Sequence, residues 1–513
     1  MRLLVFTCLC CTMASNAHLL AAQQIPAFQL TEKPGPYAVG VKVVEQYDDS
    51  RTFEATIDDL GKPFLGERAR PLQTLIWYPA QKTSSLPMTF GDYAALRATE
   101  TTFGHPRILT GVEGWLVDGM KPSFNQPLLA VRDATSVAGR FPVVIYAPSF
   151  SSVPWENVDI CEYLASHGYV VLAAPAMGVA RDSTHDVAGT NEQARDISFL
   201  IGYAATLNDT DLSKVAVAGF SWGGLANLFA AARDNRIRAL IAFDGSMRYF
   251  PGIVKQAGDV HPEEMTLPLL YFEGQNSLED QARLVGNFHS EGPNVLNSWI
   301  HGDLIDIKML GLVHPEFSAI AHRNERLWKY EFPGLQEADY GREDGKVGYG
   351  WVAKYSLIFL DAYLKQSADA AKFLHNTPAE NNVPKHVLAV HFRVAKPMPV
   401  TFDSFREQVG REGFDHVSEL YGKTQGEQPD FHLDAGTVAS WADDLLAESH
   451  FSEAIGVMQL DIHLDPSSRS YSNLAEAYLK AGNRQAAIQN YKTALEKDSG
   501  NLIAKQSLEQ LEN

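Results

Sequence analysis

The sequence predicts an α/β protein whose mainly parallel sheet is covered by helices on both faces, followed by a part made only of helices. Apolar runs of strand length alternate with helical patterns from Leu72 to Lys365, and several of these runs are apolar throughout. Strands that are buried on both faces have this composition. From Thr401 onward the pattern is helical. At 513 residues the chain is too long for one hydrophobic core, so about two to four domains are expected.

The first 22 residues have the pattern of a secretory signal peptide. Arg2 precedes an apolar run that small residues follow, so Ala17 or Ala22 is a suitable last residue of the leader. No later segment has the roughly 18 to 20 unbroken apolar residues that are needed to span a bilayer. We therefore expect an exported protein, periplasmic or secreted, without a membrane span. Three of the four cysteines lie in the leader, which leaves Cys161 without a partner for an internal disulfide.

Strand-like and helical segments alternate along the next part of the chain. Strands are expected at 72–79, 142–148, 169–175, 214–220, 237–243, 267–272 and 308–313, and helices at 156–166, 191–207, 225–233 and 351–365. A repeated order of strand, helix and strand predicts parallel neighbours in one sheet. Three longer stretches, 88–140, 246–266 and 276–307, interrupt the alternation, and inserts of this length usually form lids, binding loops or spacers.

The pattern divides the mature chain into an α/β domain (residues 23–376), a linker (377–400) and a helical domain (401–513). The linker is expected because His375–His386 is rich in Pro and Asn. In the helical domain, the segments that begin at Phe451 and Arg484 match at an offset of 33 residues. Their large and small residues resemble two tetratricopeptide repeats, at about 437–501, and the alternative is a helical hairpin of no special kind.

The segment VAVAGFSWGG (Val215–Gly224) carries the strongest functional signal. Gly219, Ser221 and Gly223 fit the pattern G-x-S-x-G, which here follows an apolar strand and opens a helix. This context predicts a nucleophile elbow, in which the serine has a strained backbone and the glycines leave room for the turn. Ser221 would lie exposed above the sheet at a helix N-terminus, where developing negative charge is favoured. The alternative is a tight glycine turn with a passive serine.

A serine hydroxyl is a weak nucleophile, so it needs a histidine to take its proton and a carboxylate to orient that histidine. The expected order along the chain is serine, acid, histidine. His314, just past the last expected strand, is the preferred candidate, and His301 in a polar loop is its rival. Asp244, Glu273 and Asp280 are the candidate acids, and their place at one edge of the sheet leaves the choice open.

Six segments follow in the order seen in the platelet-activating-factor acetylhydrolase and dienelactone hydrolase branch of α/β-hydrolases. They are RPLQTLIWYPA, FPVVIYAPSFSS, LASHGYVVLAAP, GFSWGG, IRALIAFDG and VHPEFSA. The chain resembles this branch from about Arg70 to Leu374. The resemblance implies an α/β-hydrolase fold, and in the acetylhydrolase-like group the acid follows the strand after the elbow, which is the position of Asp244.

An oxyanion hole needs two N–H donors directed at the alkoxide that forms during acyl transfer. Trp222, next to the serine, is expected to supply one donor, and Phe150, in the turn after the strand 142–148, the other. Many relatives have His-Gly in this turn, whereas this chain has Pro148-Ser149-Phe150. Pro148 has no N–H, but Phe150 does, so Phe150 is the expected second donor in this turn.

These residues predict an exported serine ester hydrolase, and the resemblance favours short acyl groups. The sequence contains no HExxH, no paired CxxC and no phosphate-binding glycine loop followed by Lys, so neither a metal nor a cofactor is expected. The net charge of −19 argues against nucleic acid as a partner. The substrate is expected to be a small-molecule ester, and the repeats offer a surface for a protein partner or for self-association. Two alternatives are a hydrolase fold without activity that acts as a scaffold, and a lactonase or peptidase with the same triad.

Overall fold

The computed structural model of the chain describes residues 28–53, 60–63, 65, 68–275, 294–324, 326 and 341–512. The chain divides into two compact units, Met1–Lys396 and Pro397–Asn513. The expected signal peptide, residues 1–22, lies outside the described residues. Within the described ranges, every helix is too short or too polar to cross a lipid bilayer.

The first unit contains one large sheet, which has ten strands in its described part, in the order β10-β9-β8-β7-β6-β4-β5-β2-β1-β3. The six central strands, in the order β9-β8-β7-β6-β4-β5, are parallel to one another. On one side of them β10 is antiparallel to β9, and on the other side β2 is antiparallel to β5 and to β1. The predicted mainly parallel sheet is therefore confirmed. Its strands are β1 (Ala38–Thr52), β2 (Ala69–Ala80), β3 (Ala130–Arg132), β4 (Phe141–Ala147), β5 (Val170–Ala173), β6 (Thr210–Phe220), β7 (Ile237–Phe243), β8 (Leu269–Glu273), β9 (Leu304–Met309) and β10 (Leu388–Arg393).

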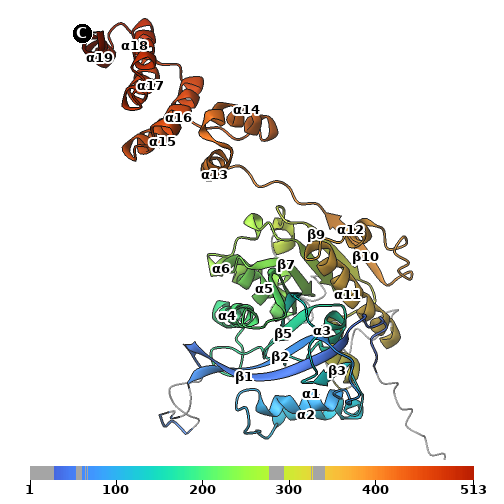
Figure 1. Cartoon of the computed structure of the whole chain (residues 1–513). Coiled ribbons are helices and arrows are strands. Elements are labelled where there is room, and N and C mark those ends of the chain that lie inside the picture. Colours follow the sequence, from blue (N-terminus) through green and yellow to red (C-terminus); the bar gives the residue numbers. More distant parts are fainter. Residues whose placement is uncertain are drawn as a thin grey trace, which may run out of the picture. The chain divides into compact units, whose positions relative to one another are not determined.

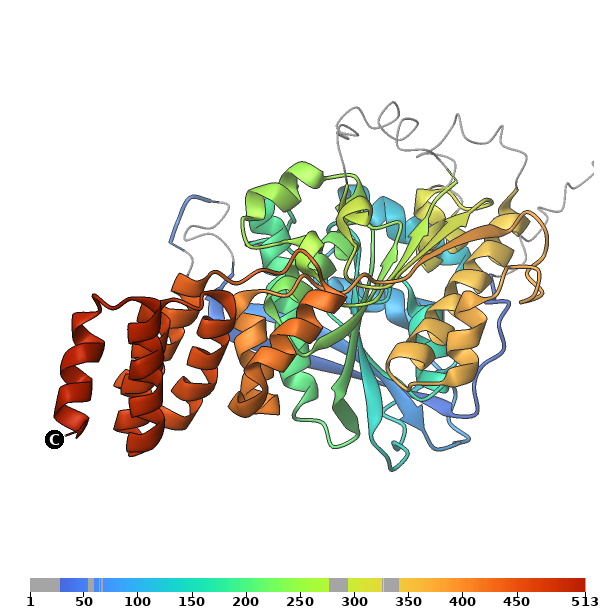
Figure 2. The ribbon, with the colours of Figure 1, turned by 90° about the horizontal axis from the view of Figure 1, so that it is seen from above.

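Helices cover both faces of this sheet (Figures 1 and 2). One face packs against α3 (Val158–Ser166) and α11 (Arg342–Tyr363), and the other against α4 (Val187–Ala204) and α5 (Trp222–Arg233). Each face has its own hydrophobic core. Along β4, Val144 and Tyr146 belong to one core, while Val143 and Ile145 belong to the other. Alternate side chains point to opposite faces of a strand, so a strand that supplies two cores is apolar throughout.

Besides the short strand β3, which lies in the stretch 88–140 where no strand was expected, the structure differs from the sequence-based expectation at three strands. The first is β1, which was not expected because its second half, from Glu45, is polar; it is held by antiparallel pairing with β2 over most of its length. The second is the strand expected at 308–313, which instead spans Leu304–Met309, where apolar and polar residues alternate. The third is β10, which lies inside the segment 377–400 assigned to a linker and pairs with β9 along its whole length.

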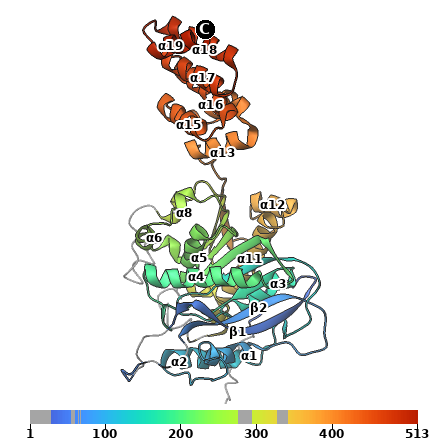
Figure 3. The ribbon, with the colours of Figure 1, turned by 60° about the vertical axis from the view of Figure 1, so that its left-hand side comes forward.

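The insert of residues 88–140 forms two helices beside the strands β1 and β2 (Figure 3). They are α1 (Phe90–Ala95) and α2 (Gly111–Met120), each followed by a 3-10 turn. Buried Glu162 of α3 ties this insert to the sheet: it accepts hydrogen bonds from the Tyr93 hydroxyl at 2.8 Å and from the backbone N–H of Leu129 at 2.6 Å. The insert at 246–266 contains α6 (Pro251–Ala257), and most of the third lies outside the described residues. Shorter helices of this unit are α8 (Val295–Ser298), α9 (Ala319–Arg323) and α12 (Ala368–His375).

The second unit is helical throughout its described elements, which confirms the predicted C-terminal helical domain. Its helices are α13 (Phe402–Glu412), α14 (Val417–Glu427), α15 (Ala435–Ala447), α16 (Phe451–Leu464), α17 (Ser468–Lys480), α18 (Arg484–Lys497) and α19 (Leu502–Glu512). The first residues of α15 and α17 are 33 positions apart, as are those of α16 and α18. Small residues such as Ala475, Ala487 and Ala494 are fully buried where α17, α18 and α19 pack. The likeness to tetratricopeptide repeats stays a prediction.

Candidate active site

Ser221 lies in the sharp turn between β6 and α5. Its backbone has φ +52° and ψ −116°, a conformation that L-residues adopt only under strain. A side-chain carbon at Gly219 would lie 2.5 Å from the carbonyl carbon of Gly223, and one at Gly223 would lie 2.1 Å from the carbonyl oxygen of Ala147. Both glycines are therefore required by contact, and the segment has the strand, turn and helix that the motif predicts.

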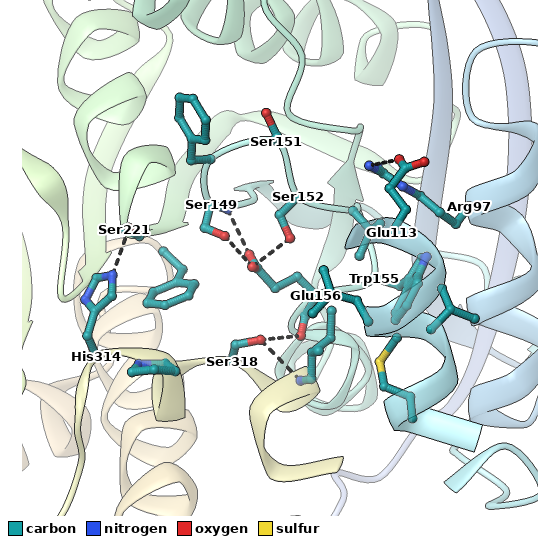
Figure 4. A pocket seen from close by; sticks show the side chains of 18 residues that line it. Arg97, Glu113, Ser149, Ser151, Ser152, Trp155, Glu156, Ser221, His314 and Ser318 are labelled. Carbon is teal, nitrogen blue, oxygen red and sulfur yellow. Dashed lines mark hydrogen bonds and ion pairs between the residues drawn. The ribbon is translucent and has the colours of Figure 1, made fainter. Parts of the chain in front are cut away.

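His314 lies next to this serine, although 93 positions separate them in the sequence. Its Nε2 atom is 2.9 Å from Ser221 Oγ, and its ring packs against Phe220 with centroids 5.0 Å apart. It begins the short 3-10 helix His314–Phe317, which follows β9. The rival His301 lies elsewhere, with Nδ1 2.9 Å from the carbonyl oxygen of Lys396. Figure 4 shows His314 next to Ser221, whereas the hydrogen bond of His301 is to the backbone of Lys396.

Asp244 lies on the other side of His314, just after β7, and is fully buried. Its carboxylate is 2.6 Å from His314 Nδ1 and also accepts hydrogen bonds from the Tyr249 hydroxyl and, at 3.3 Å, from the backbone N–H of Gly274. Burial alone would raise the pKa of Asp244. The hydrogen bonds from His314, Tyr249 and Gly274 outweigh burial and hold this pKa below its usual value. The carboxylate therefore stays ionised, with its negative charge directed at His314.

The other two candidate acids have different surroundings. Glu273, at the end of β8, forms ion pairs with Arg248 at 3.0 Å and with Lys308 at 3.3 Å. In the described part of the chain, the ion-pair partners of Glu273 are these two cations and not His314. Asp280 lies outside the described residues.

The two expected oxyanion donors occupy adjacent turns. Trp222 is the first residue of α5, and Phe150 lies in the turn after β4. Among the described residues, neither backbone N–H donates a hydrogen bond to another group. The side chains also pack together: the Phe150 ring stacks on His185 at 3.7 Å and meets the Trp222 ring edge-on at 5.8 Å. Two N–H groups are thus free on rigid, aromatic-packed turns beside the serine.

A cavity of about 320 Å³ opens beside Ser221 and His314. Its apolar wall comes from α2 (Leu116, Val117 and Met120) and from Val153 and Trp155. Figure 4 shows Arg97 and Glu113 at the end of the cavity away from Ser221.

An ion-pair cluster of the insert lies at that distant end. Glu113 of α2 accepts hydrogen bonds from Arg97 at 2.6 Å and from Arg107 at 2.5 Å. The hydrogen bond from Arg107, with the charge of both arginines, lowers the pKa of Glu113 to about 2. The charges of Arg97 and Glu113 are therefore paired with each other, and the apolar wall from α2, Val153 and Trp155 is suited to an apolar group of a substrate.

Sequence reasoning did not identify the residues that support this site. Tyr249, which donates to Asp244, belongs to no motif and lies in an insert whose fold was not readable. The same holds for the α2 residues that line the cavity. In the described ranges no group of three or more His, Cys, Asp and Glu side chains could hold a metal ion.

The strand order, the elbow and the hydrogen-bonded Ser221, His314 and Asp244 define the α/β-hydrolase class. Comparison with known proteins finds a family whose model matches part of the chain. Residues 129–276, less than a third of the chain, match the model of the Dienelactone hydrolase family. The matched range includes the elbow and Asp244 and ends before His314.

Two individual proteins are also similar. A provisionally named carboxymethylenebutenolidase from Yersinia pestis is 28% identical over 121 residues, which are 21% of this chain and 45% of that protein. The chain thus matches less than half the length of this curated relative. A ferulic acid esterase from Streptomyces cinnamoneus has a solved structure that is 18% identical, with a TM-score of 0.48, and the alignment covers 71% of this chain and 98% of that chain.

Proposed function

We propose that this chain is a serine hydrolase that cleaves a carboxylic ester or lactone. The observation that carries the proposal is the continuous hydrogen-bonded chain from Ser221 Oγ through His314 to Asp244, beside a cavity. The match to the dienelactone hydrolase model and the name of the Yersinia pestis relative support the same reaction class. We also propose that the chain is similar in its reaction to the platelet-activating-factor acetylhydrolases, as the resemblance in sequence implies.

In the first half of the reaction, Ser221 Oγ attacks the carbonyl carbon while His314 Nε2 takes the hydroxyl proton. Asp244, fixed by Tyr249, holds Nδ1 of His314 and stabilises the imidazolium. The oxygen of the tetrahedral intermediate is stabilised by the backbone N–H groups of Trp222 and Phe150. The C–O bond to the alcohol then breaks, and His314 donates its proton to the leaving oxygen.

The second half releases the acid. His314 removes a proton from water, whose oxygen attacks the acyl carbon of the ester on Ser221, and the same two N–H groups stabilise the second intermediate. Collapse of this intermediate returns the proton to Ser221 Oγ and frees the carboxylic acid. With a lactone, the alcohol oxygen stays attached to the released hydroxy acid.

A small acyl group fits best. The cavity of about 320 Å³ is at the lower end of the range of about 300 to 1,000 Å³ that is typical of ligand pockets. Its apolar wall reaches the Arg97–Glu113 ion pair, whose charges disfavour contact with a longer apolar chain. We therefore expect turnover to fall for acyl chains that are longer than the distance from Ser221 to the Arg97–Glu113 pair.

We also propose that the protein is exported, since residues 1–22 have the pattern of a signal peptide. Expression with and without these residues, followed by fractionation of the cells, tests this. Retention of the intact precursor in the cytoplasm would contradict it.

The function is tested with p-nitrophenyl esters of graded chain length, a γ-lactone and a fluorophosphonate probe. The wild-type protein should hydrolyse short esters and become labelled at one serine. Ser221→Ala should lose labelling and at least about 10⁴-fold of kcat, because the acyl-enzyme route is removed. A wild-type protein that is folded but neither labelled nor active would favour the scaffold alternative.

The histidine assignment has a matched control within the chain. His314→Ala should lose activity to a similar extent as Ser221→Ala, because no other base is within hydrogen-bonding distance of Ser221 Oγ among the described residues. His301→Ala should retain nearly full activity, since its ring contacts the backbone of Lys396 instead. The reverse order would refute the assignment.

A further inference from the structure

A buried carboxylate that the proposed mechanism does not use contacts the turn that carries Phe150 and lies at the wall of the cavity. Glu156 follows this turn just before α3, and its side chain is almost fully buried. Oε2 accepts the backbone N–H of Ser149 at 2.8 Å and the Tyr146 hydroxyl at 3.0 Å. Oε1 accepts the hydroxyls of Ser149 and, at 2.7 Å, of Ser152. Figure 4 shows the carboxylate directed toward Ser149 and Ser152.

These hydrogen bonds decide which N–H groups of the turn are left for a ligand. Pro148 has no N–H, and the N–H of Ser149 donates to Glu156. In the described part of the chain, the N–H groups of Phe150 and Ser151 donate to no other group. The first free backbone N–H after β4 is therefore that of Phe150. The N–H of Ser149, which precedes it, is not free because it donates to Glu156.

The opposite side of the turn is held by groups that do not involve Glu156. The side chain of Gln193 donates to the carbonyl oxygen of Pro148 at 2.7 Å. The backbone N–H of Ala176 donates to the carbonyl oxygen of Ser152 at 3.0 Å. Between them, Ser151 has a left-handed backbone with φ +52°, which is strained for a serine. A strained turn held from two sides reorganises when the hydrogen bonds on one side are lost.

The number of hydrogen bonds that Glu156 accepts fits an ionised carboxylate better than a neutral side chain. Four hydrogen bonds point at its two oxygens, and an ionised carboxylate only accepts. Burial raises the pKa of Glu156, and the hydrogen bonds from Ser149, Ser152 and Tyr146 oppose this effect. Withdrawal of the carboxylate would leave the N–H of Ser149, in a partly buried turn, without its acceptor, and the loss of this hydrogen bond favours a rearranged turn.

We propose that Glu156 is a positioning residue for the oxyanion hole, because it holds the turn after β4 in the conformation that leaves the Phe150 N–H free beside Ser221. This inference rests on the proposed function. Glu156 acts through the turn and not on the reacting atoms. It should therefore affect the stabilisation of the tetrahedral intermediate more than the binding of the ester.

Two substitutions of Glu156 distinguish the effect of side-chain length from the effect of charge. Glu156→Gln removes the charge but keeps an oxygen that can accept the Ser149 N–H, while the serine hydroxyls can turn to accept from the amide. Glu156→Asp keeps the charge but withdraws the carboxylate by one methylene. We expect Glu156→Gln to retain kcat within about 5-fold, and Glu156→Asp to lose about 10- to 100-fold of kcat with KM within about 3-fold.

Glu162, on the helix α3 that follows Glu156, supplies the matched control. It is also a fully buried glutamate that accepts one backbone N–H and one tyrosine hydroxyl, but its donors, Leu129 and Tyr93, belong to the insert. Glu162→Asp therefore shortens an equivalent side chain without touching the oxyanion turn. It should leave kcat unchanged within about 2-fold, while KM can change because the insert lines the cavity.

A transition-state analogue gives a readout that a purely structural role would not move. A short-chain trifluoromethyl ketone forms a hemiketal with Ser221 whose oxygen is an oxyanion, so its inhibition constant should weaken in Glu156→Asp by the same factor as kcat/KM. The rate of labelling by a fluorophosphonate should fall in parallel, while the melting temperature stays close to that of Glu162→Asp.

The outcomes separate this inference from the proposed function. Equal or better activity of Glu156→Asp than of Glu156→Gln would overturn it, as would a loss of kcat with no change in the inhibition constant. Equal losses in the Asp variants of Glu156 and Glu162 would also overturn it, because they would show a general effect on stability. If the wild-type protein neither hydrolyses esters nor reacts with the probe, the proposed function itself falls, and this inference with it.

Discussion

Nδ1 of His314 lies 2.6 Å from the carboxylate of Asp244, which is 70 positions earlier in the sequence and fully buried. The contact joins the end of β7 to the turn after β9, two strands away in the sheet. Glu273, at the end of the strand between them, pairs with Arg248 and Lys308 instead. Asp244 is therefore the acid that can orient the histidine, whereas Glu273 forms ion pairs with two cations at the same edge of the sheet.

The first prediction compares these two acids. Asp244→Asn should lower kcat by about 10³- to 10⁴-fold, because an amide cannot stabilise the imidazolium and favours the wrong tautomer of His314. Glu273→Gln should lower kcat by less than about 5-fold. Steady-state kinetics on a p-nitrophenyl ester measure both. A larger loss for Glu273→Gln would move the acid to the later strand.

The second prediction concerns the elbow glycines. Gly223→Ala should destabilise the first unit by about 3 kcal/mol or more, since the new carbon would lie 2.1 Å from the backbone oxygen of Ala147, which cannot move without β4. Gly252→Ala in α6, where no atom lies within 4 Å, is the control and should be neutral or stabilising by up to about 1 kcal/mol. Urea unfolding followed by tryptophan fluorescence measures both, and equal stability of the two variants would contradict the contact.

The third prediction concerns the boundary between the two units. A chain that ends at Lys396 keeps β10 and the hydrogen bond from the Lys396 N–H to the Ile300 carbonyl at 2.8 Å, and should remain soluble and hydrolyse a small ester. A chain that ends at Lys385 loses β10, exposes the edge of β9 and should aggregate or melt earlier. Melting temperatures and turnover of the two fragments measure this.

The same fragments test the role of the helical unit. We propose that it binds a protein partner or a second copy of the chain, so removal should change the oligomeric state or the action on a large substrate. Light scattering of the full chain and of the fragment that ends at Lys396 measures the first effect. A soluble fragment that has lost turnover of a small ester would show that the helical unit completes the site.

The fourth prediction is a pH dependence of stability. Burial raises the pKa of Glu162 to about 7 from its ordinary value of 4.5, although hydrogen bonds from the Leu129 N–H and the Tyr93 hydroxyl oppose this. The folded state therefore binds more protons than the unfolded state between these two pH values. The contribution of Glu162 to stability should fall as the pH rises through this window and be least favourable above about pH 7.

Glu162→Gln removes this titration and keeps an acceptor for the Leu129 N–H. Relative to wild type, it should gain on the order of 1 to 3 kcal/mol between pH 5 and pH 8. Other groups with raised pKa values, such as Glu100, titrate in both proteins and cancel in the comparison. Unfolding at the two pH values measures the difference, and a difference that does not depend on pH would contradict the titration.

Local features of the sequence were sufficient for the class of fold and for the elbow. The runs around Val144 and Val217 are apolar because each strand supplies two cores, and this composition is visible without knowing which strands are neighbours. The pattern around Ser221 is equally local, since Gly219 and Gly223 are needed for contacts within one turn. Composition also separated the helical unit, because its helices pack mainly on their sequence neighbours.

Strand pairing at the edges and the environment of the acid depend on distant residues, so the sequence left them open. β10 is a strand because β9 offers an unpaired edge, although its own residues lie in a segment typical of a linker. Asp244 and Glu273 both end strands at one edge, and only the folded chain brings Tyr249 to the first and Arg248 to the second.

The sequence by itself therefore determined the α/β alternation, the serine turn and the separate helical domain, because each rests on contacts within a few positions of the chain. Only the tertiary structure decided which histidine lies next to the serine, which carboxylate contacts that histidine, that Ser149 and Ser152 donate to Glu156, and that α2 lines the cavity. The physical reason is that hydrogen bonds and burial at this site join segments 70 and 93 positions apart, whose meeting is set by the packing of the whole sheet.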